Sequence, residues 1–204
     1  MIEYTCYSKE RCDLVRENIL INKIIKEKNE SRITELLLII SGTIFLGMTA
    51  RITIMLPFTP VPITGQTFGV LMIGLVYGRK LGLKTIGSYL AAGMAGLPFF
   101  STGGPGLLFL KPTGGYLIGY VFMVLICGYL TEKGWGKSYI KTFGIMMIAE
   151  TALYLCGLIH LSFFVKANVL EMGLYPFIIG DLVKMALVTF SVPSIWKAVK
   201  FFKK

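Results

Sequence analysis

The chain has 204 residues, of which 21 are Lys or Arg and 11 are Asp or Glu, and its formal net charge is +10. A basic balance of this size is typical of nucleic-acid-binding proteins. However, 54% of the residues are hydrophobic and only 16% are charged, whereas a soluble domain carries about a quarter charged residues. Because so much apolar surface needs burial, the composition also excludes a disordered chain.

The charge is unevenly distributed along the chain. Residues 1–35 contain seven basic and seven acidic residues, so the whole excess of +10 belongs to the apolar region 36–204. A basic excess inside an apolar region is typical of a membrane protein with positively charged cytoplasmic loops. We therefore expect a polar cytoplasmic extension over 1–35, followed by one transmembrane domain over 36–204. The extension is interpreted either as an interfacial helix or as a mobile tail.

Six apolar stretches follow in chain order. The first has 21 residues, enough to cross about 30 Å of hydrocarbon. The second and third are short, so we expect them to be tilted or to end in loops buried within the protein. The predicted spans are Leu36–Leu56, Thr67–Tyr77, Leu81 (or Thr85)–Leu97, Gly114–Leu130, Thr142–Val165 and Leu174–Ile195.

The loops between these stretches predict their orientation. With a cytoplasmic N-terminus, the inner segments 1–35, 79–84, 131–141 and 196–204 together hold 17 basic residues. The outer loops hold only Lys111 and Lys166. This asymmetry predicts six transmembrane helices with both termini in the cytoplasm.

Several enzymatic and metal chemistries have little support in the sequence. The four cysteines (Cys6, Cys12, Cys127 and Cys156) form no CxxC pair, and His160 is the single histidine, so no zinc or haem site is expected. Gly134–Ser138 resembles the end of a phosphate-binding loop, but Thr131 stands where that motif needs glycine. We interpret it as a turn, so any active transport depends on an ion gradient or on a partner.

Four ionisable residues lie within the predicted spans: Arg51, Glu150, Asp181 and Lys184. Charged groups at membrane depth are costly and are therefore candidates for function. Asp181 and Lys184 are three residues apart and share a helix face toward the outer side. They predict either ion bridges that hold the bundle together or a site for a polar, anionic solute, and the two interpretations are compatible.

Two outer loops have unusual composition. The segment Leu56–Thr67 contains three prolines within six residues, which makes a stiff extended connection. The segment Pro98–Thr113 is rich in glycine, which permits close approach of a ligand or of another segment. Both lie on the side of Asp181 and Lys184, so we expect them to form a lid over a cavity.

These motifs together resemble the BioY family, the biotin-specific S components of energy-coupling factor (ECF) transporters. The resemblance spans about 130 residues, and it departs from the family pattern at Lys111, where the family often has glycine. The residues that carry it are Leu56–Thr67, Tyr89, Leu90, Gly93, Gly96–Pro98, Pro112–Leu117, Tyr175–Phe177, Gly180–Leu182 and Lys184.

The resemblance implies an all-α bundle of six transmembrane helices that binds biotin at its outer face. Asp181 and Lys184 match the family's Asp and Lys on the last helix and are the principal candidate ligands. The remaining candidates are polar or glycine residues of the first loop and fourth helix, aromatic residues that cover the apolar parts of biotin, and the two other intramembrane charges. They are Thr64, Gln66, Thr113, Gly114, Tyr116, Phe58, Phe68, Phe99, Glu150 and Arg51.

The resemblance also implies partners in the bacterial cell membrane. A transmembrane coupling subunit and two cytoplasmic ATP-binding subunits are expected to drive release of the vitamin, with Thr43, Gly47 and Ala50 as candidate docking residues. No cofactor or nucleic acid is expected. Two alternatives stay open: an S component for another small vitamin, and a membrane enzyme that uses Glu150 and Asp181 as an acid/base or metal pair.

Overall fold

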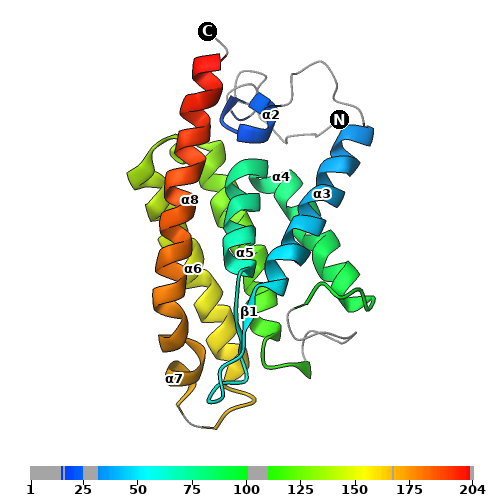
Figure 1. Cartoon of the computed structure of the whole chain (residues 1–204), viewed down its shortest axis with the longest axis vertical. Coiled ribbons are helices and arrows are strands. Elements are labelled where there is room, and N and C mark those ends of the chain that lie inside the picture. The colour runs from blue at the N-terminus through cyan, green and yellow to red at the C-terminus, as the bar shows by residue number, and fades with distance from the viewer. Residues whose placement is uncertain (1–14, 16, 25–31, 101–109, 167, 203–204) are drawn as a thin grey trace.

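The computed structural model describes residues 15, 17–24, 32–100, 110–166 and 168–202. Most of them are helical, and the long helices run roughly along one axis (Figure 1). Three features of the sequence lie wholly or largely outside these residues. They are the predicted extension 1–35, the cysteines Cys6 and Cys12, and the glycine-rich part of the second outer loop. The elements are α2 (Leu20–Ile24), α3 (Arg32–Arg51), β1 (Thr53–Ile54), β2 (Ile63–Thr64), α4 (Gln66–Met94), α5 (Gly114–Glu132), η2 (Trp135–Lys137), α6 (Tyr139–Leu161), α7 (Val169–Gly173) and α8 (Tyr175–Phe202).

Four helical stretches of the described chain are long and apolar enough to cross a membrane. They are Arg32–Arg51, Gly114–Glu132, Tyr139–Leu161 and Val169–Val199. These stretches correspond to the first, fourth, fifth and sixth predicted spans. The first helix ends at Arg51 rather than at Leu56, because residues 53–54 pair as a strand with residues 63–64. Arg51 is therefore the exposed last residue of a helix.

The second and third predicted spans form the two halves of α4, which bends sharply at Gly78 (Figure 1). Gly78 has φ 73° and ψ −174°, a backbone conformation that side chains with a Cβ rarely adopt. A Cβ at this position would also lie 3.0 Å from Cδ1 of Ile19. The bend thus depends on glycine for its backbone angles, and the packing of Ile19 leaves little room for a side chain.

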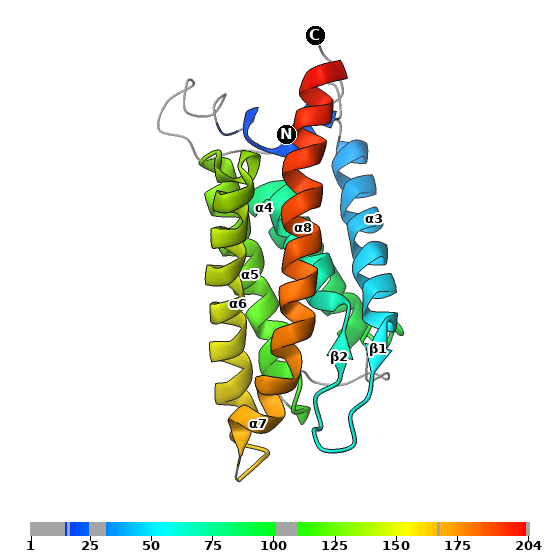
Figure 2. The ribbon, with the colours of Figure 1, turned by 60° about the vertical axis from the view of Figure 1, so that its left-hand side comes forward.

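The segment before α3 closes the end of the bundle where α4 bends. Ile19 and Leu20 are fully buried there. The Nδ2 atom of Asn18 donates a hydrogen bond to the carbonyl oxygen of Glu132, 2.9 Å away, at the end of α5. This end also carries the start of α3 and the end of α8 (Figures 1 and 2), so it contains most of the predicted cytoplasmic segments. We call it the inner end.

A short antiparallel hairpin lies at the opposite end, which we call the outer end (Figure 2). In this hairpin Thr53 pairs with Thr64 and Ile54 with Ile63. The hydroxyl of Thr59 donates a hydrogen bond to the carbonyl oxygen of Met172 at 2.6 Å. The proline-rich loop is therefore held against α7, across the end of the bundle.

Candidate functional site

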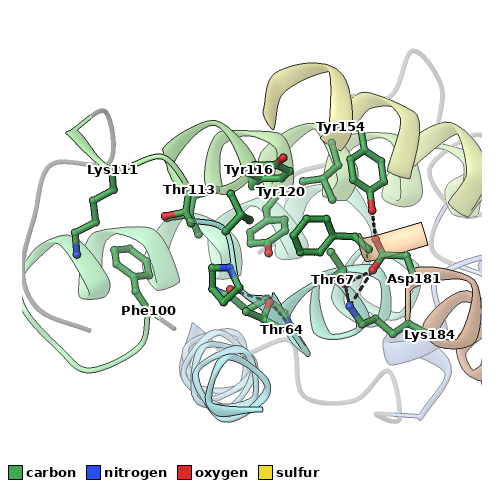
Figure 3. Close-up of a pocket in the computed structure, with 16 residues that line it drawn as sticks. Thr64, Thr67, Phe100, Lys111, Thr113, Tyr116, Tyr120, Tyr154, Asp181 and Lys184 are labelled. Carbon is green, nitrogen blue, oxygen red and sulfur yellow. Dashed lines mark hydrogen bonds and ion pairs between the residues drawn. The ribbon is translucent and has the colours of Figure 1, made fainter. Parts of the chain in front are cut away.

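The outer end contains a pocket between the β1–β2 hairpin, the first half of α4, and helices α5, α6 and α8 (Figure 3). It encloses about 700 Å³ of space free of atoms, its open mouth included. Its wall combines apolar, aromatic, hydroxyl and charged side chains, as small-molecule sites usually do. The lining residues are Val61, Pro62, Thr64, Gln66, Thr67, Phe100, Lys111, Thr113, Tyr116, Leu117, Tyr120, Leu153, Tyr154, Phe177, Asp181 and Lys184.

A charged group lies at one side of this pocket and joins three helices (Figure 3). The Nζ atom of Lys184 lies 2.8 Å from Oδ1 of Asp181, and both side chains are largely buried. The hydroxyl of Thr67, on α4, donates to the same Oδ1 atom at 3.2 Å and accepts from Lys184 at 2.8 Å. Tyr154, on α6, donates to the other carboxylate oxygen of Asp181. The two buried charges are thus paired, and the carboxylate is held in a fixed orientation.

A second polar group extends from the hairpin toward the second half of α4. The Thr64 hydroxyl donates to Oε1 of Gln66 at 3.1 Å, and the Gln66 side-chain amide donates to the hydroxyl of Tyr89. Tyr89 in turn donates to the carbonyl oxygen of Phe99 at 2.9 Å. Because each polar side chain has a partner, this chain of hydrogen bonds fixes the orientation of Gln66 at the pocket wall.

The remaining wall supplies apolar surface and further anchoring of the loops. Tyr116 lines the pocket while its hydroxyl donates to the carbonyl oxygen of Gly173, 2.8 Å away, just before α8. His160 has Nε2 at 3.1 Å from the carbonyl oxygen of Lys111, so α6 contacts the second outer loop. Lys111 and the Asp181–Lys184 group lie on opposite sides of the pocket (Figure 3).

Six of the predicted substrate-binding residues line this pocket: Thr64, Gln66, Thr113, Tyr116, Asp181 and Lys184. The other six do not. Gly114 is buried beside Thr113 at the start of α5. Phe58 is exposed on the proline-rich loop, Phe68 packs on the core, and Phe99 stacks on Tyr89.

Arg51 and Glu150 also lie outside the pocket wall. Arg51 is exposed at the outer end of α3. Glu150 is buried within α6, one helical turn from Tyr154 in the direction of the inner end.

The structure adds residues that the sequence reasoning did not select. Thr67 and Tyr154 complete the group around Asp181, and Phe100 lines the wall where Phe99 was expected. Thr67 is the last residue of the proline-rich motif, so its position was a usable signal. No sequence motif pointed to Tyr154, because only the packing of α6 against α8 brings it to Asp181.

The three candidate docking residues face the interior of the chain. Thr43 donates a hydrogen bond to the carbonyl oxygen of Thr85 at 3.4 Å, and Ala50 is fully buried. A Cβ at Gly47 would lie 2.7 Å from the ring of Phe99. These small residues therefore allow α3 to approach the second half of α4 and the Phe99 ring. The exposed face of α3 is formed by other residues: Ile33, Leu36, Leu37, Ile40, Ile44 and Met48.

The arrangement suits recognition of a ligand better than a covalent step. Asp181 is held by three neighbours, which fixes its carboxylate as a binding group. The fold and its apolar helices define a multi-pass helical membrane protein with a pocket at one end.

Comparison with known proteins gives the family. A sequence profile of the BioY family matches residues 24–201, so the chain belongs to the BioY family. It is 33% identical to the biotin transporter BioY of Thermotoga maritima, over 66% of this chain and 80% of that protein. It is 36% identical to the biotin transporter BioY of Rhizobium etli, over 68% of this chain and 79% of that protein.

The fold also matches a solved structure. The crystal structure of the S component for biotin from an ECF-type ABC transporter superposes with a TM-score of 0.75 and 28% sequence identity. The match covers 84% of this chain and 95% of that one. Both comparisons indicate a transporter rather than an enzyme.

Proposed function

We propose that this protein binds biotin in the outer pocket and delivers it inward as the S component of an ECF transporter. The observation that carries the proposal is the group of Asp181, Lys184, Thr67 and Tyr154 in a pocket at the outer end, in a chain of the BioY family. Biotin has a ureido group with two N–H donors and one carbonyl acceptor, and a tail that ends in a carboxylate. A fixed carboxylate accepts N–H donors, and an ammonium group binds either a carbonyl or a carboxylate.

The other pocket residues have complementary proposed roles. Thr64, Gln66, Thr113 and Tyr116 provide further polar contacts, and Phe100, Leu153 and Phe177 enclose the apolar ring and chain of biotin. Gly114 begins α5, and the positive end of the helix dipole there suits an anionic group. Phe58 on the proline-rich loop is the candidate for closing over the bound vitamin. Phe68, Phe99 and Arg51 lie outside the pocket wall, so they would contribute to binding without touching the vitamin.

We also propose that the chain crosses the membrane six times, with both ends in the cytoplasm. The support is the bend at Gly78, which splits α4 into two segments, and the 17 basic residues of the expected inner segments. The inner end would face a transmembrane coupling subunit and two ATP-binding subunits in a bacterial cell membrane. Residues 1–35 would form a cytoplasmic extension, of which Ile19 and Leu20 are buried against the transmembrane domain.

Equilibrium binding of labelled biotin to the detergent-purified protein tests the site. Replacing Asp181 by Asn or Lys184 by Ala leaves the other member of a buried pair without its charged partner, so biotin affinity should fall about 30-fold or more. Lys166→Ala, at an exposed position outside the pocket, is the matched control and should bind as wild type. Unchanged affinity in both folded pocket variants would overturn the assignment.

A competition experiment distinguishes biotin from other vitamins. Excess unlabelled biotin should displace the labelled ligand, while other water-soluble vitamins at the same concentration should not. Displacement by another vitamin at lower concentration than biotin would identify an S component of different specificity.

A further inference from the structure

Glu150 is a buried carboxyl group that the pocket does not use. It is 5% exposed, and neither of its oxygen atoms has a hydrogen-bond partner within the part of the chain that the structure describes. It lies on α6 four residues before Tyr154, which places it one turn closer to the inner end than the Asp181 group. An ionised carboxylate without hydrogen bonds at membrane depth is very costly, whereas the protonated form is much less so.

The charged and titratable groups around Glu150 come from α5, α8 and α6 itself. Asp181 and Lys184 of α8 both interact with it electrostatically, with opposite signs. Cys127 and Tyr120 of α5 and Tyr154 of α6 itself lie within electrostatic range. Because Lys184 is already paired with Asp181 at 2.8 Å, a second carboxylate charge here would have no cation of its own.

The other unpartnered polar atoms of the interior continue from Glu150 toward the inner end. Within the described ranges, every buried side-chain nitrogen or oxygen without a hydrogen-bond partner belongs to α5, α6 or α8. They are Thr131, Thr142, Glu150, Thr189 and Trp196. Thr189 is five residues beyond Lys184 and Thr142 is eight residues before Glu150, so both lie further inward along their helices. Buried polar groups of this kind are normally satisfied by ordered water.

We propose that Glu150 is a proton-binding site beneath the pocket, and that it must hold its proton for the pocket to bind an anionic ligand tightly. Water along Thr189 and Thr142 exchanges this proton with the inner end. The proposal rests on the proposed function, because it assumes that biotin binds beside Asp181 and Lys184. In this proposal Glu150 controls the affinity of the pocket for biotin, although its side chain does not contact the ligand.

The sign of the effect follows from charge. While Glu150 is protonated, the opposite charges of Asp181 and Lys184 cancel each other. Loss of the proton from Glu150 adds a negative charge beneath an anionic ligand. At a separation of about 10 Å and an effective dielectric constant of about 20, like charges change an equilibrium constant roughly tenfold. Biotin affinity should therefore be full at low pH and fall about tenfold as Glu150 ionises at higher pH.

The test is the biotin dissociation constant measured from about pH 6 to about pH 9.5 for wild type and for Glu150→Gln, a neutral side chain of the same shape. The variant should keep the low-pH affinity and lose the decline that is due to Glu150. Biotin methyl ester, which lacks the negative charge, should show a smaller decline with wild type. If wild type and variant bind biotin with the same pH profile, the inference is wrong; if neither binds biotin at any pH, the proposed function fails instead.

Infrared spectroscopy provides a readout that does not depend on binding. The ligand-free wild type should show the C=O stretch of a protonated carboxyl group, and the band should be missing from the spectrum of Glu150→Gln. The band should shift in D₂O, and the shift should be slower in a Thr189→Val, Thr142→Val double variant. Absence of the band in the wild type would refute the proton site, and an unchanged exchange rate would refute the water route.

Discussion

Thr67 of α4 accepts a hydrogen bond from Nζ of Lys184, 2.8 Å away on α8. The same hydroxyl donates to Asp181, so one neutral side chain connects both members of the buried ion pair. This connection joins the segment that follows the proline-rich loop to the last helix. The charged group of the pocket is therefore tied to the start of α4, directly after that loop.

Thr67→Val removes this connection while keeping the shape of the side chain. Loss of a hydrogen bond to a buried charged group costs about 1–3 kcal/mol, so biotin affinity should fall about fivefold or more. Thr67→Ser keeps the hydroxyl and should stay close to wild type. The measurement is equilibrium binding of labelled biotin, and a loss in Thr67→Ser without a loss in Thr67→Val would show that the methyl group, rather than the hydroxyl, matters.

Lys111 should attract an anionic ligand from the pocket wall opposite Lys184. Lys111→Ala is expected to weaken biotin binding a few-fold at low salt, and the effect should shrink at about 0.5 M salt because salt screens a charge that is only half-buried. Lys166→Ala, outside the pocket, should leave the biotin affinity unchanged at both salt concentrations. A loss that persists at high salt and applies equally to biotin methyl ester would indicate a packing role.

Thr59 controls how firmly the proline-rich loop is held. Its hydroxyl donates to the carbonyl oxygen of Met172 at 2.6 Å and accepts from the backbone N–H of Val61 at 3.2 Å. Because Val61 lines the pocket, Thr59→Val should loosen the covering loop and speed dissociation of biotin roughly threefold to tenfold. Thr59→Ser should dissociate at the wild-type rate. A chase with excess unlabelled biotin measures these rates, and an unaltered rate for the valine variant would argue against a lid.

Gly78→Ala tests the bend of α4. A side chain at φ 73° is strained, and its Cβ would meet Ile19, so the variant should be destabilised by about 1–3 kcal/mol. Gly87→Ala is the matched control, because this helical glycine has nothing within 4 Å of an added Cβ and alanine favours helix. Thermal unfolding in detergent should show a lower midpoint for the first variant alone; a similar midpoint for both would mean that the bend tolerates a side chain.

The sequence alone determined the properties that depend on composition and on local helical geometry. Apolar length and the distribution of basic residues identified a multi-pass membrane protein. The spacing of Asp181 and Lys184 placed both on one face of α8, because residues three apart in a helix are neighbours whatever surrounds them. The proline-rich motif and the motif at the start of α5 supplied four of the predicted lining residues: Thr64, Gln66, Thr113 and Tyr116.

Only the tertiary structure decided which helices complete the site. Phe100 rather than Phe99 lines the wall because of the course of the loop that follows α4, and Tyr154 reaches Asp181 because of the relative rotation and register of packed helices. For the same reason Thr43, Gly47 and Ala50 face the interior, and Glu150 is buried without a hydrogen-bond partner among the described residues. Helix rotation depends on the summed packing of many side chains from distant parts of the chain, so no local pattern in the sequence could specify it.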